Sequence, residues 1–444
     1  MNHGEEVSLE ESSAEEGEES KEIDVSRIDL NALWVIRRLR ARGYEAYLTG
    51  GCVRDLLLGQ VPKDFDVATS AKPSEIRSVF SNCRLVGRRF LLAHVYFPGG
   101  RVIETATFRA APDPDAAGDD LLLRRDNVYG TLQEDALRRD LTINGLFYDP
   151  IACRLIDFVG GRQDLREGVI RSIGDPDVRM QEDPVRMIRA VRFACRLGFH
   201  IEQQTLQAIQ SHAGAIVRCA PARLQEELLG LLRSGLAAPS MMRCRELGLL
   251  SALLPELTEA LECPLQPGQE EDKPSSPEER LGQWQAVLQA LDRVRHKGVH
   301  IDAAVAFATL LLPIYLAFER SDQKARIWLE GLCMSWGKQV RLVRRDQELL
   351  RFLLESMAGV FVRGGDDDTM KSLVHKVWFR QVLLLRIIHL CAQGESLDEV
   401  KKWKEAAHRE GRPYTQEKEA DRKNRQQTQR RYTRTRSSSR RRFS

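Results

Sequence analysis

Residues 48–68 (LTGGCVRDLLLGQVPKDFDVA) limit what this chain can fold into more than any other part of it. Gly50 and Gly51 separate a strand-like run at 45–49 from a helix-like run at 53–58, and residues 64–68 then alternate as a strand does. This order predicts a mixed α/β unit. At its glycine turn, the free N–H groups that begin the helix can hold a phosphate, and glycine lets the phosphate approach closely.

Two carboxylates follow the predicted helix. Asp64 and Asp66 stand at i and i+2 of the predicted strand, which points both side chains to one face, about 7 Å apart along the chain. Two like charges held together need cations, and carboxylate oxygens suit Mg²⁺. Two such ions could activate an attacking hydroxyl and stabilise a leaving pyrophosphate. An isolated pair of this kind is more often solvated, but the glycine turn and Arg54 beside it favour a catalytic pair.

Two later segments combine arginines with acidic or amide side chains. They are RRDLTIN at 138–144 and EDPVRMIR at 182–189. On a helix, Asp183 and Arg186 share a face and could present an acceptor and a donor fork to the edge of a base. Taken alone, the segments fit equally well a solvated strand edge and a capped helix with an internal ion pair.

In order and spacing, these motifs resemble the head of the class II nucleotidyltransferases, the group that contains the bacterial poly(A) polymerases and the tRNA CCA-adding enzymes. The resemblance covers residues 45–200. It implies a metal-dependent enzyme, a polynucleotide adenylyltransferase, that adds AMP from ATP to RNA 3′ ends without a template and with two Mg²⁺ ions. In the family, the residues that match Asp183 and Arg186 take the part of a template strand.

The resemblance also implies the roles of individual residues. Asp64 and Asp66 are the implied metal ligands and catalytic residues. Glu104 is the candidate for a third catalytic carboxylate, and a structural ion pair between Glu104 and Arg109 is the alternative. The implied nucleotide-binding residues are Gly50, Gly51, Arg54, Arg109, Arg138, Arg139, Asp140, Asn144, Asp183, Arg186 and Arg189.

Segments outside the shared motifs favour the poly(A) polymerase I branch of the family. They lie at 84–95, 220–227 and 381–407. Leu91 and Gly145 depart from that branch, in which a basic residue and an alanine are usual. The alternatives are a tRNA CCA-adding nucleotidyltransferase and a non-catalytic RNA-binding adaptor.

The two ends of the chain carry opposite charge. Residues 1–24 hold ten carboxylates against one lysine, and residues 421–444 hold ten lysines or arginines against one aspartate. The acidic start has too little apolar material to fold, and the basic end suits phosphate attraction. We expect both ends to be disordered, with RNA-processing proteins as further partners through them. The predicted RNA-binding residues are Arg422, Lys423, Arg425, Arg430, Arg431, Arg434, Arg436, Arg440, Arg441 and Arg442.

Helical periodicity dominates after residue 183, so the predicted class is α+β: a nucleotidyltransferase head with a small mixed sheet and helices, followed by an elongated all-helical neck and body. The expected domains are an acidic tail (1–26), the catalytic head (27–160), a helical neck with the base-recognition helix and an RNA-binding region (161–261), a linker (262–279), a helical body (280–415) and a basic tail (416–444).

The nine cysteines are scattered and form no C-x-x-C pair, which predicts a reducing, cytoplasmic location. The longest apolar run, at 303–318, is shorter than the about 20 residues of a membrane span and contains Pro313. We therefore expect a buried helix there and no membrane partner.

Overall fold

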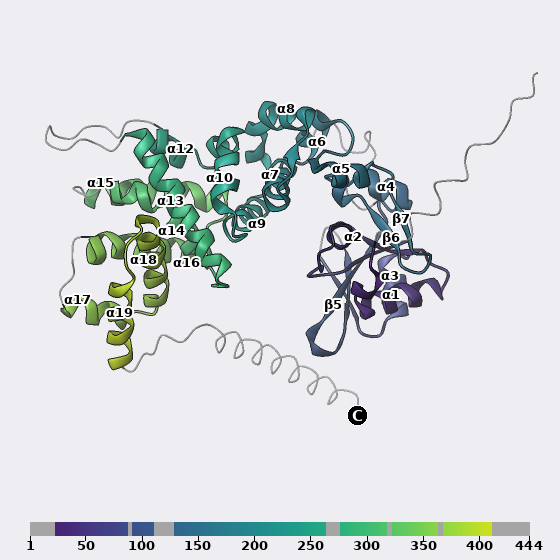
Figure 1. Ribbon diagram of the computed structural model, residues 1–444, viewed down its shortest axis with the longest axis horizontal. Helices are drawn as coiled ribbons and strands as arrows, with labels where there is room; N and C mark the ends of the chain where they lie inside the picture. Colours follow the sequence, from purple (N-terminus) through teal and green to yellow (C-terminus); the bar gives the residue numbers. More distant parts are fainter. Residues whose placement is uncertain are drawn as a thin grey trace, which may run out of the picture. The chain divides into compact units, whose positions relative to one another are not determined.

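The structure, a computed structural model, describes residues 23–87, 91–110, 128–262, 276–317, 322–362 and 367–410. The chain divides into two units, Met1–Cys219 and Ala220–Ser444 (Figure 1). Strands occur in the described part of the first unit, whereas the described part of the second is helical. The predicted α+β class is therefore confirmed. The bounds of the six predicted domains stay a prediction, and the predicted RNA-binding residues of the basic tail lie outside the described ranges.

A seven-stranded sheet organises the first unit, in the order β3-β4-β5-β2-β1-β6-β7. Among the described strands of this sheet, β2 and β5 pair in parallel and the other neighbours are antiparallel. A separate pair of short strands, β8 and β9, is parallel. The strands are β1 (Ala46–Thr49), β2 (Asp66–Thr69), β3 (Cys83–Val86), β4 (Leu92–Tyr96), β5 (Val102–Thr107), β6 (Phe147–Asp149), β7 (Arg154–Ile156), β8 (Val169–Ile170) and β9 (His200–Ile201).

Helices α1 and α3 cover one face of this sheet, where they contact β1 to β5 (Figure 1). Val67, Val95 and Ile103 are fully buried on β2, β4 and β5. Because side chains alternate along a strand, their neighbours Asp66, His94 and Glu104 point to the opposite face. Because α1 and α3 cover the apolar face, Asp66, His94 and Glu104 remain available for chemistry on the opposite face.

Local sequence signals account for the helix ends of the first unit. A capping box between Thr131 and Glu134 begins α4, Asp175 caps α6 ahead of Pro176, and Gly198 in the left-handed region ends α7. The helices are α1 (Leu30–Arg40), α2 (Gly51–Leu57), α3 (Pro73–Val79), α4 (Leu132–Leu137), α5 (Gly161–Glu167), α6 (Pro176–Glu182), α7 (Val185–Leu197) and α8 (Gln203–His212), with 3₁₀ turns at Val25–Arg27, Pro98–Gly100, Thr142–Asn144 and Ala213–Arg218.

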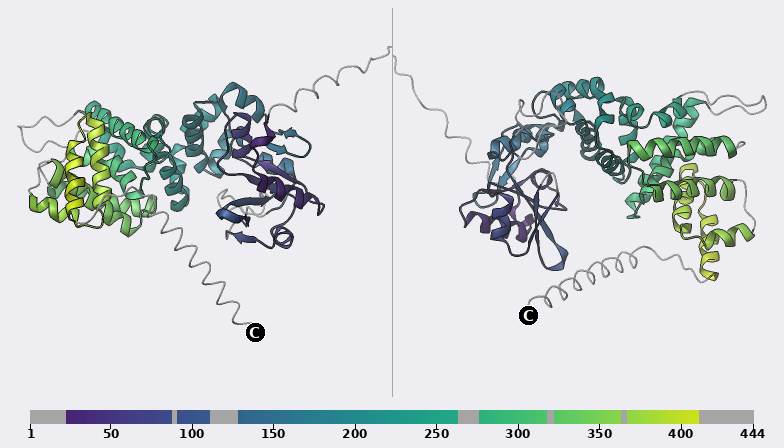
Figure 2. Two further views of the ribbon diagram at one scale, coloured as in Figure 1. Left: turned by 60° about the horizontal axis from the view of Figure 1, so that its bottom comes forward. Right: turned by 180° about the vertical axis from the view of Figure 1, so that it is seen from behind.

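The described part of the second unit is built of helices (Figure 2). Its helix α14 is buried along nearly its whole length and contacts α9, α12, α13, α16 and α18. This confirms the buried helix predicted from the apolar run. The helices are α9 (Pro221–Leu232), α10 (Ala237–Glu246), α11 (Leu249–Leu253), α12 (Pro255–Glu262), α13 (Pro277–His296), α14 (Ala303–Ala317), α15 (Asp322–Gln339), α16 (Arg344–Ser356), the π-helix Met357–Val362, α17 (Asp367–Val374), α18 (Phe379–Gln393) and α19 (Asp398–Arg409). Throughout the described ranges, every helix is too short or too polar to cross a membrane.

Candidate nucleotide and metal site

Cross-strand pairing brings a row of polar side chains together on the open face of the sheet. Asp66, the first residue of β2, lies opposite Thr49 of β1 and opposite Glu104 of β5. His94 of β4 lies opposite Glu104 in turn. Residues far apart in the chain are therefore neighbours across four strands.

Asp64 does not lie on the strand predicted for it. The strand begins at Asp66, and Asp64 is an exposed residue in the bend before it. The prediction that places Asp64 on the strand with Asp66 was therefore wrong, although Asp64 lies close enough to raise the pKa of Asp66. The reason is that β1, the antiparallel partner of β2, ends its pairing at Thr49 opposite Asp66 and offers no partner to Asp64.

Asp66 carries the most informative electrostatic signal in this row. The pKa of Asp66 is raised to about 6, with burial as the largest cause; Glu104 and Asp64 contribute to this rise, while Arg139 acts in the opposite direction. A carboxylate that is crowded by two others gains from a bound cation, which would neutralise the repulsion. Oxygen ligands of this type fit Mg²⁺.

Few described protein side chains near Asp66 could coordinate a metal ion. Within the described ranges, no group of three or more His, Cys, Asp or Glu side chains is placed to hold a metal ion. Asp64 and Asp66 can supply protein oxygens, and phosphate oxygens are the usual remaining ligands of such an ion.

Glu104 is half exposed, and its Oε1 lies 3.5 Å from His94 Nε2. The pairing partner seen for Glu104 is thus His94, which sequence reasoning missed. Arg109, the partner considered in the alternative, is buried beyond the end of β5, where its backbone N–H donates to Asp135 at 3.1 Å. The signal that could have found His94 was the Pro98-Gly99-Gly100 turn, which lets the run at 94–97 pair with the strand that carries Glu104.

The glycine turn is tightly enclosed. Gly50 adopts φ +68°, in the region that favours glycine, and its N–H donates to the Leu146 carbonyl at 3.1 Å. A Cβ at this position would lie 3.1 Å from Arg139 Nη1. Arg139 therefore connects the turn with Asp66, because its positive charge acts to lower the raised pKa of Asp66.

A buried carboxylate that the sequence reasoning missed holds both predicted arginines of the 138–139 pair. Asp135 is 2% exposed and accepts from Arg138 at 2.9 Å through Oδ1 and from Arg139 at 2.9 Å through Oδ2. Burial alone would raise the pKa of Asp135, but Arg139 and Arg138 outweigh burial and lower it. The available signal was spacing, since an acid three and four residues before two arginines shares a helix face with them.

Four of the predicted nucleotide-binding residues form a hydrogen-bonded chain. Arg54 donates through Nη1 to Asn144 Oδ1 at 2.7 Å, Asn144 Nδ2 donates to Asp140 Oδ1 at 3.4 Å, and Arg189 Nε donates to Asp140 Oδ2 at 2.6 Å. Burial acts to raise the pKa of Asp140, yet Arg189 and Arg186 together lower it. Residues from α2, the 140–144 turn and α7 are thus brought to one place.

Asp183 and Arg186 are arranged differently from the prediction. Asp183 lies between α6 and α7 rather than inside one helix, because Pro184 interrupts the helical hydrogen bonding after Glu182. Arg186 is in the first turn of α7, and its Nη2 donates to the Arg138 carbonyl at 3.4 Å. The two residues remain close, since the Arg186 N–H donates to the Asp183 carbonyl at 3.0 Å.

One donor of the Arg186 guanidinium has no hydrogen-bond acceptor in the described part of the protein. Its Nη1 is buried without a hydrogen-bond acceptor among the described residues and lies 3.7 Å from Glu182 Oε2. Burial, followed by repulsion from Arg179, lowers the pKa of Arg186 to about 10. A buried donor without an acceptor is costly, so it favours a ligand atom that accepts.

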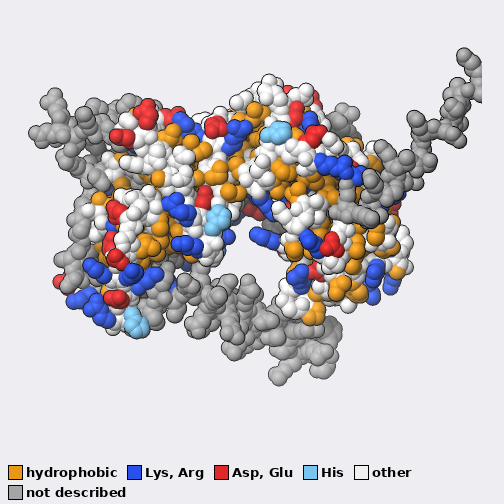
Figure 3. All heavy atoms as spheres, in the orientation of Figure 1, with side chains coloured by type: hydrophobic (Ala, Val, Ile, Leu, Met, Phe, Trp, Pro, Cys, Tyr) orange, Lys and Arg blue, Asp and Glu red, His pale blue; other side chains and the backbone are white. Residues whose placement is uncertain are grey.

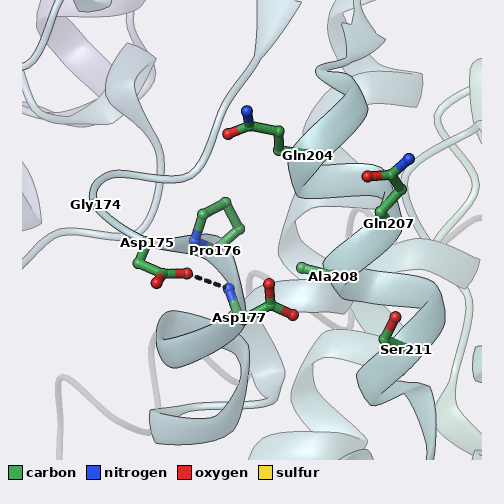
Figure 4. Close-up of a pocket in the computed structure, with 8 residues that line it drawn as sticks. All are labelled: Gly174, Asp175, Pro176, Asp177, Gln204, Gln207, Ala208 and Ser211. Atoms are coloured by element: carbon green, nitrogen blue, oxygen red, sulfur yellow. Dashed lines mark hydrogen bonds between the residues drawn. The ribbon is translucent and has the colours of Figure 1, made fainter.

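A groove of about 620 Å³ between α6 and α8 lies apart from these residues (Figure 4). It contains none of the predicted site residues. Its lining comprises Gly174, Asp175, Pro176, Asp177, Gln204, Gln207, Ala208 and Ser211.

Two family models match the chain. Residues 46–171 match the Poly A polymerase head domain, and residues 198–261 match a family described as the probable RNA and SrmB-binding site of polymerase A. The first match covers Gly50, Asp66 and Asn144; the helix with Arg186 and Arg189 lies between the two matches.

Individual relatives agree with these models. The chain is 51% identical over 243 residues to poly(A) polymerase I of Salmonella typhimurium, which covers 53% of this chain and 52% of that protein. It is 38% identical over 228 residues to a CCA-adding enzyme of Geobacillus thermodenitrificans, and this alignment covers 51% of this chain and 55% of that protein. The chain thus spans about half the length of the curated relatives it matches.

A solved structure extends the similarity over both units. The CCA-adding enzyme of Bacillus stearothermophilus in complex with CTP matches with a TM-score of 0.61 at 25% identity, covering 85% of this chain and 80% of that one. The order of a sheet-containing head and a helical remainder is therefore shared with it.

Proposed function

We propose that this chain, whose residues 46–171 match the Poly A polymerase head domain and which is similar to poly(A) polymerases and CCA-adding enzymes, transfers AMP from ATP to the 3′ ends of RNA. The observation that carries the proposal is that Arg139 connects the carboxylate row, Asp66 and Glu104, with the arginine cluster, which comprises Arg54, Arg138, Arg139, Arg186 and Arg189. The Arg139 guanidinium acts to lower the pKa of Asp66, lies against Gly50 and donates to Asp135.

The proposed reaction joins the RNA 3′ oxygen to the α-phosphorus of ATP and breaks the bond from that phosphorus to the oxygen bridging to the β-phosphate. Mg²⁺ held by Asp64 and Asp66 would supply charge neutralisation and ease deprotonation of the attacking hydroxyl. Arg138, Arg139 and Arg54 bind and orient the triphosphate, whose charge they offset. Catalysis then rests on positioning and electrostatics, with no protein nucleophile.

For the base, we assign Arg186 and Asp183. The unused Nη1 donor of Arg186 would meet a ring acceptor of adenine, and Asp183 would accept from the exocyclic amine. The full proposed nucleotide set stays as the sequence predicted it, with Glu104 as the third carboxylate and Arg109 and Gly51 at the edges of the site.

Adenylation is favoured over CCA addition because identity to the poly(A) polymerase, at 51%, exceeds identity to the CCA-adding enzyme, at 38%. A non-catalytic RNA-binding adaptor is the third alternative. The intact carboxylate row and the filled arginine cluster speak against it, since an abandoned site would not keep buried charges at their cost in stability.

RNA binding is proposed for three regions. One is residues 198–261, by their match to the RNA- and SrmB-binding family, which also makes an RNA-processing protein a proposed partner. The second is the basic tail. The third is the end of the second unit at α17 and α19, where Lys and Arg side chains gather in Figure 3; Lys376, Lys402 and Arg409 are exposed there.

A cytoplasmic location completes the proposal. The eight cysteines within the described ranges are all free thiols, which supports a reducing compartment.

The test is primer extension with purified protein. A tRNA lacking CCA and an unrelated RNA with a free 3′-OH are each incubated with Mg²⁺ and one NTP at a time, with Asp66→Ala as the inactive control. Long products made from ATP alone on both RNAs support the proposal. Addition that stops after C, C and A on the tRNA alone would assign the chain to CCA addition, and no extension with any NTP would favour the adaptor.

A further inference from the structure

Phe193 of α7 is surrounded by three arginines, Arg54, Arg189 and Arg192. Its side chain is 6% exposed. The guanidinium carbon of Arg54 lies 4.9 Å from the centre of its ring, that of Arg192 lies 5.3 Å away and that of Arg189 lies 5.6 Å away. Three cations on one aromatic ring, at separations that permit cation–π attraction, are an unusual concentration of charge on a hydrophobic residue.

The Phe193 ring completes a closed loop of five interacting side chains. Arg54 bonds Asn144, Asn144 bonds Asp140 and Asp140 bonds Arg189, as described above. Arg54 and Arg189, at the two ends of this chain of hydrogen bonds, both contact the Phe193 ring. The other four members are all proposed nucleotide contacts, and Phe193 is the member that joins the two ends.

The geometry of Arg54 shows why an aromatic ring suits this position. Its Nε and Nη2 donate to Asp55 Oδ1 at 2.9 and 2.6 Å, and its Nη1 donates to Asn144. These bonds lie in the plane of the guanidinium, so its flat face remains for stacking. An aromatic face therefore orients Arg54 without taking a donor away from it, whereas an aliphatic side chain would fill the space without the electrostatic attraction.

The same ring connects two elements that handle different parts of the proposed nucleotide. Arg54 belongs to α2, directly after the glycine turn, and Arg189 belongs to α7, one turn beyond Arg186. Arg196, further along α7, lies 3.4 Å from Asp55 and strengthens this junction. The phosphate side and the base side of the site therefore meet at Phe193.

We propose that Phe193 is a positioning residue for ATP, which acts by holding the Arg54 and Arg189 guanidinium groups in the orientations that bind the nucleotide. The inference rests on the proposed function, because it needs these arginines to contact ATP.

The experiment compares Phe193→Leu, which removes the ring, with Phe193→Tyr, which keeps it, in the full chain. Phe193→Leu should raise the KM for ATP about tenfold, which corresponds to about 1.4 kcal/mol, while kcat stays within about threefold. Phe193→Tyr should restore the KM for ATP to within about twofold of the original. The KM for the RNA primer should be the same in all three proteins.

Phe80→Leu is the matched control. Phe80 is 1% exposed, follows α3 and packs against the Trp34 ring at 5.5 Å, away from the arginine cluster. This variant should lower the melting temperature as Phe193→Leu does, yet leave the KM for ATP unchanged. If Phe193→Leu is too unstable to assay, Phe193→Met removes the ring at similar volume and carries the same expectation.

Three results would overturn the inference: an unchanged KM for ATP in the variants without the ring, equal effects of Leu and Tyr, or a KM change in Phe80→Leu of the same size. Failure of the proposed function looks different, because the unmodified protein would then not extend RNA with ATP at all.

Discussion

Replacing Asp66 with Asn should stabilise the metal-free protein at neutral pH, although it removes a proposed catalytic residue. The ordinary pKa of 3.8 applies in the unfolded chain, and burial together with Glu104 raises the pKa to about 6 in the folded protein. At 1.36 kcal/mol for each pKa unit, the ionised Asp66 costs the folded state about 3 kcal/mol. Asn has nearly the same shape and carries no charge, so it avoids this cost.

The pH dependence has a definite sign. The folded protein binds the Asp66 proton more tightly than the unfolded chain, so the original protein loses stability as pH rises from about 4 to about 6 and changes no further above that. Asp66→Asn lacks this loss. The difference in unfolding free energy between the two proteins should be small at pH 4 and reach about 3 kcal/mol above pH 6.5.

Urea unfolding with a chelator present, at several pH values between 4 and 8, measures this difference directly. Asp140→Asn is the control with the opposite sign, because Arg189 and Arg186 lower the pKa of Asp140 and its charge stabilises the fold. Adding Mg²⁺ should then stabilise the original protein more than Asp66→Asn. Parallel stability curves for the original protein and Asp66→Asn across this range would refute the reasoning.

Three further predictions concern base choice, the glycine turn and the tail. Arg186→Ala should relax discrimination among NTPs by about 1–3 kcal/mol in kcat/KM; a purely structural role would lower activity with every NTP alike. Gly50→Ala should cost about 1–2 kcal/mol of stability, from its positive φ, and raise the KM for ATP, because the new Cβ would lie 3.1 Å from Arg139 Nη1; unchanged melting and KM would contradict this. Removing residues 422–444 should make the salt dependence of RNA binding shallower by about 3 in log–log slope, if half of the ten cations contact phosphates, and equal slopes would assign RNA binding to the helices.

Local patterns predicted several elements of both units correctly. The glycine turn with its helix, the helical character of the chain after residue 183 and the buried α14 each follow from signals within short stretches of sequence. Two predictions failed for different reasons. Asp64 falls outside β2 because its pairing with a neighbouring strand, β1, ends at Asp66, whereas Asp183 falls outside α7 because the next residue in the sequence, Pro184, interrupts the helix.

The residues that the sequence did not single out share one property. His94, Asp135 and Phe193 each matter through the side chain that they contact: Glu104, the Arg138–Arg139 pair and Arg54, respectively. His94 reaches Glu104 by the register of the β4–β5 hairpin, whereas Phe193 reaches Arg54 across 139 positions of chain, which no local window contains.

The sequence by itself determined the chemical inventory of this protein: paired carboxylates, clustered arginines, a glycine turn, an α+β order of elements and two ends of opposite charge. Only the tertiary structure decided how these groups act. Strand register sets Asp66 beside Glu104 and raises its pKa to about 6, and packing of α7 on α2 places Arg54 and Arg189 on one ring. The physical reason is that charge interactions depend on distance and burial, which are properties of the folded chain and of no single residue.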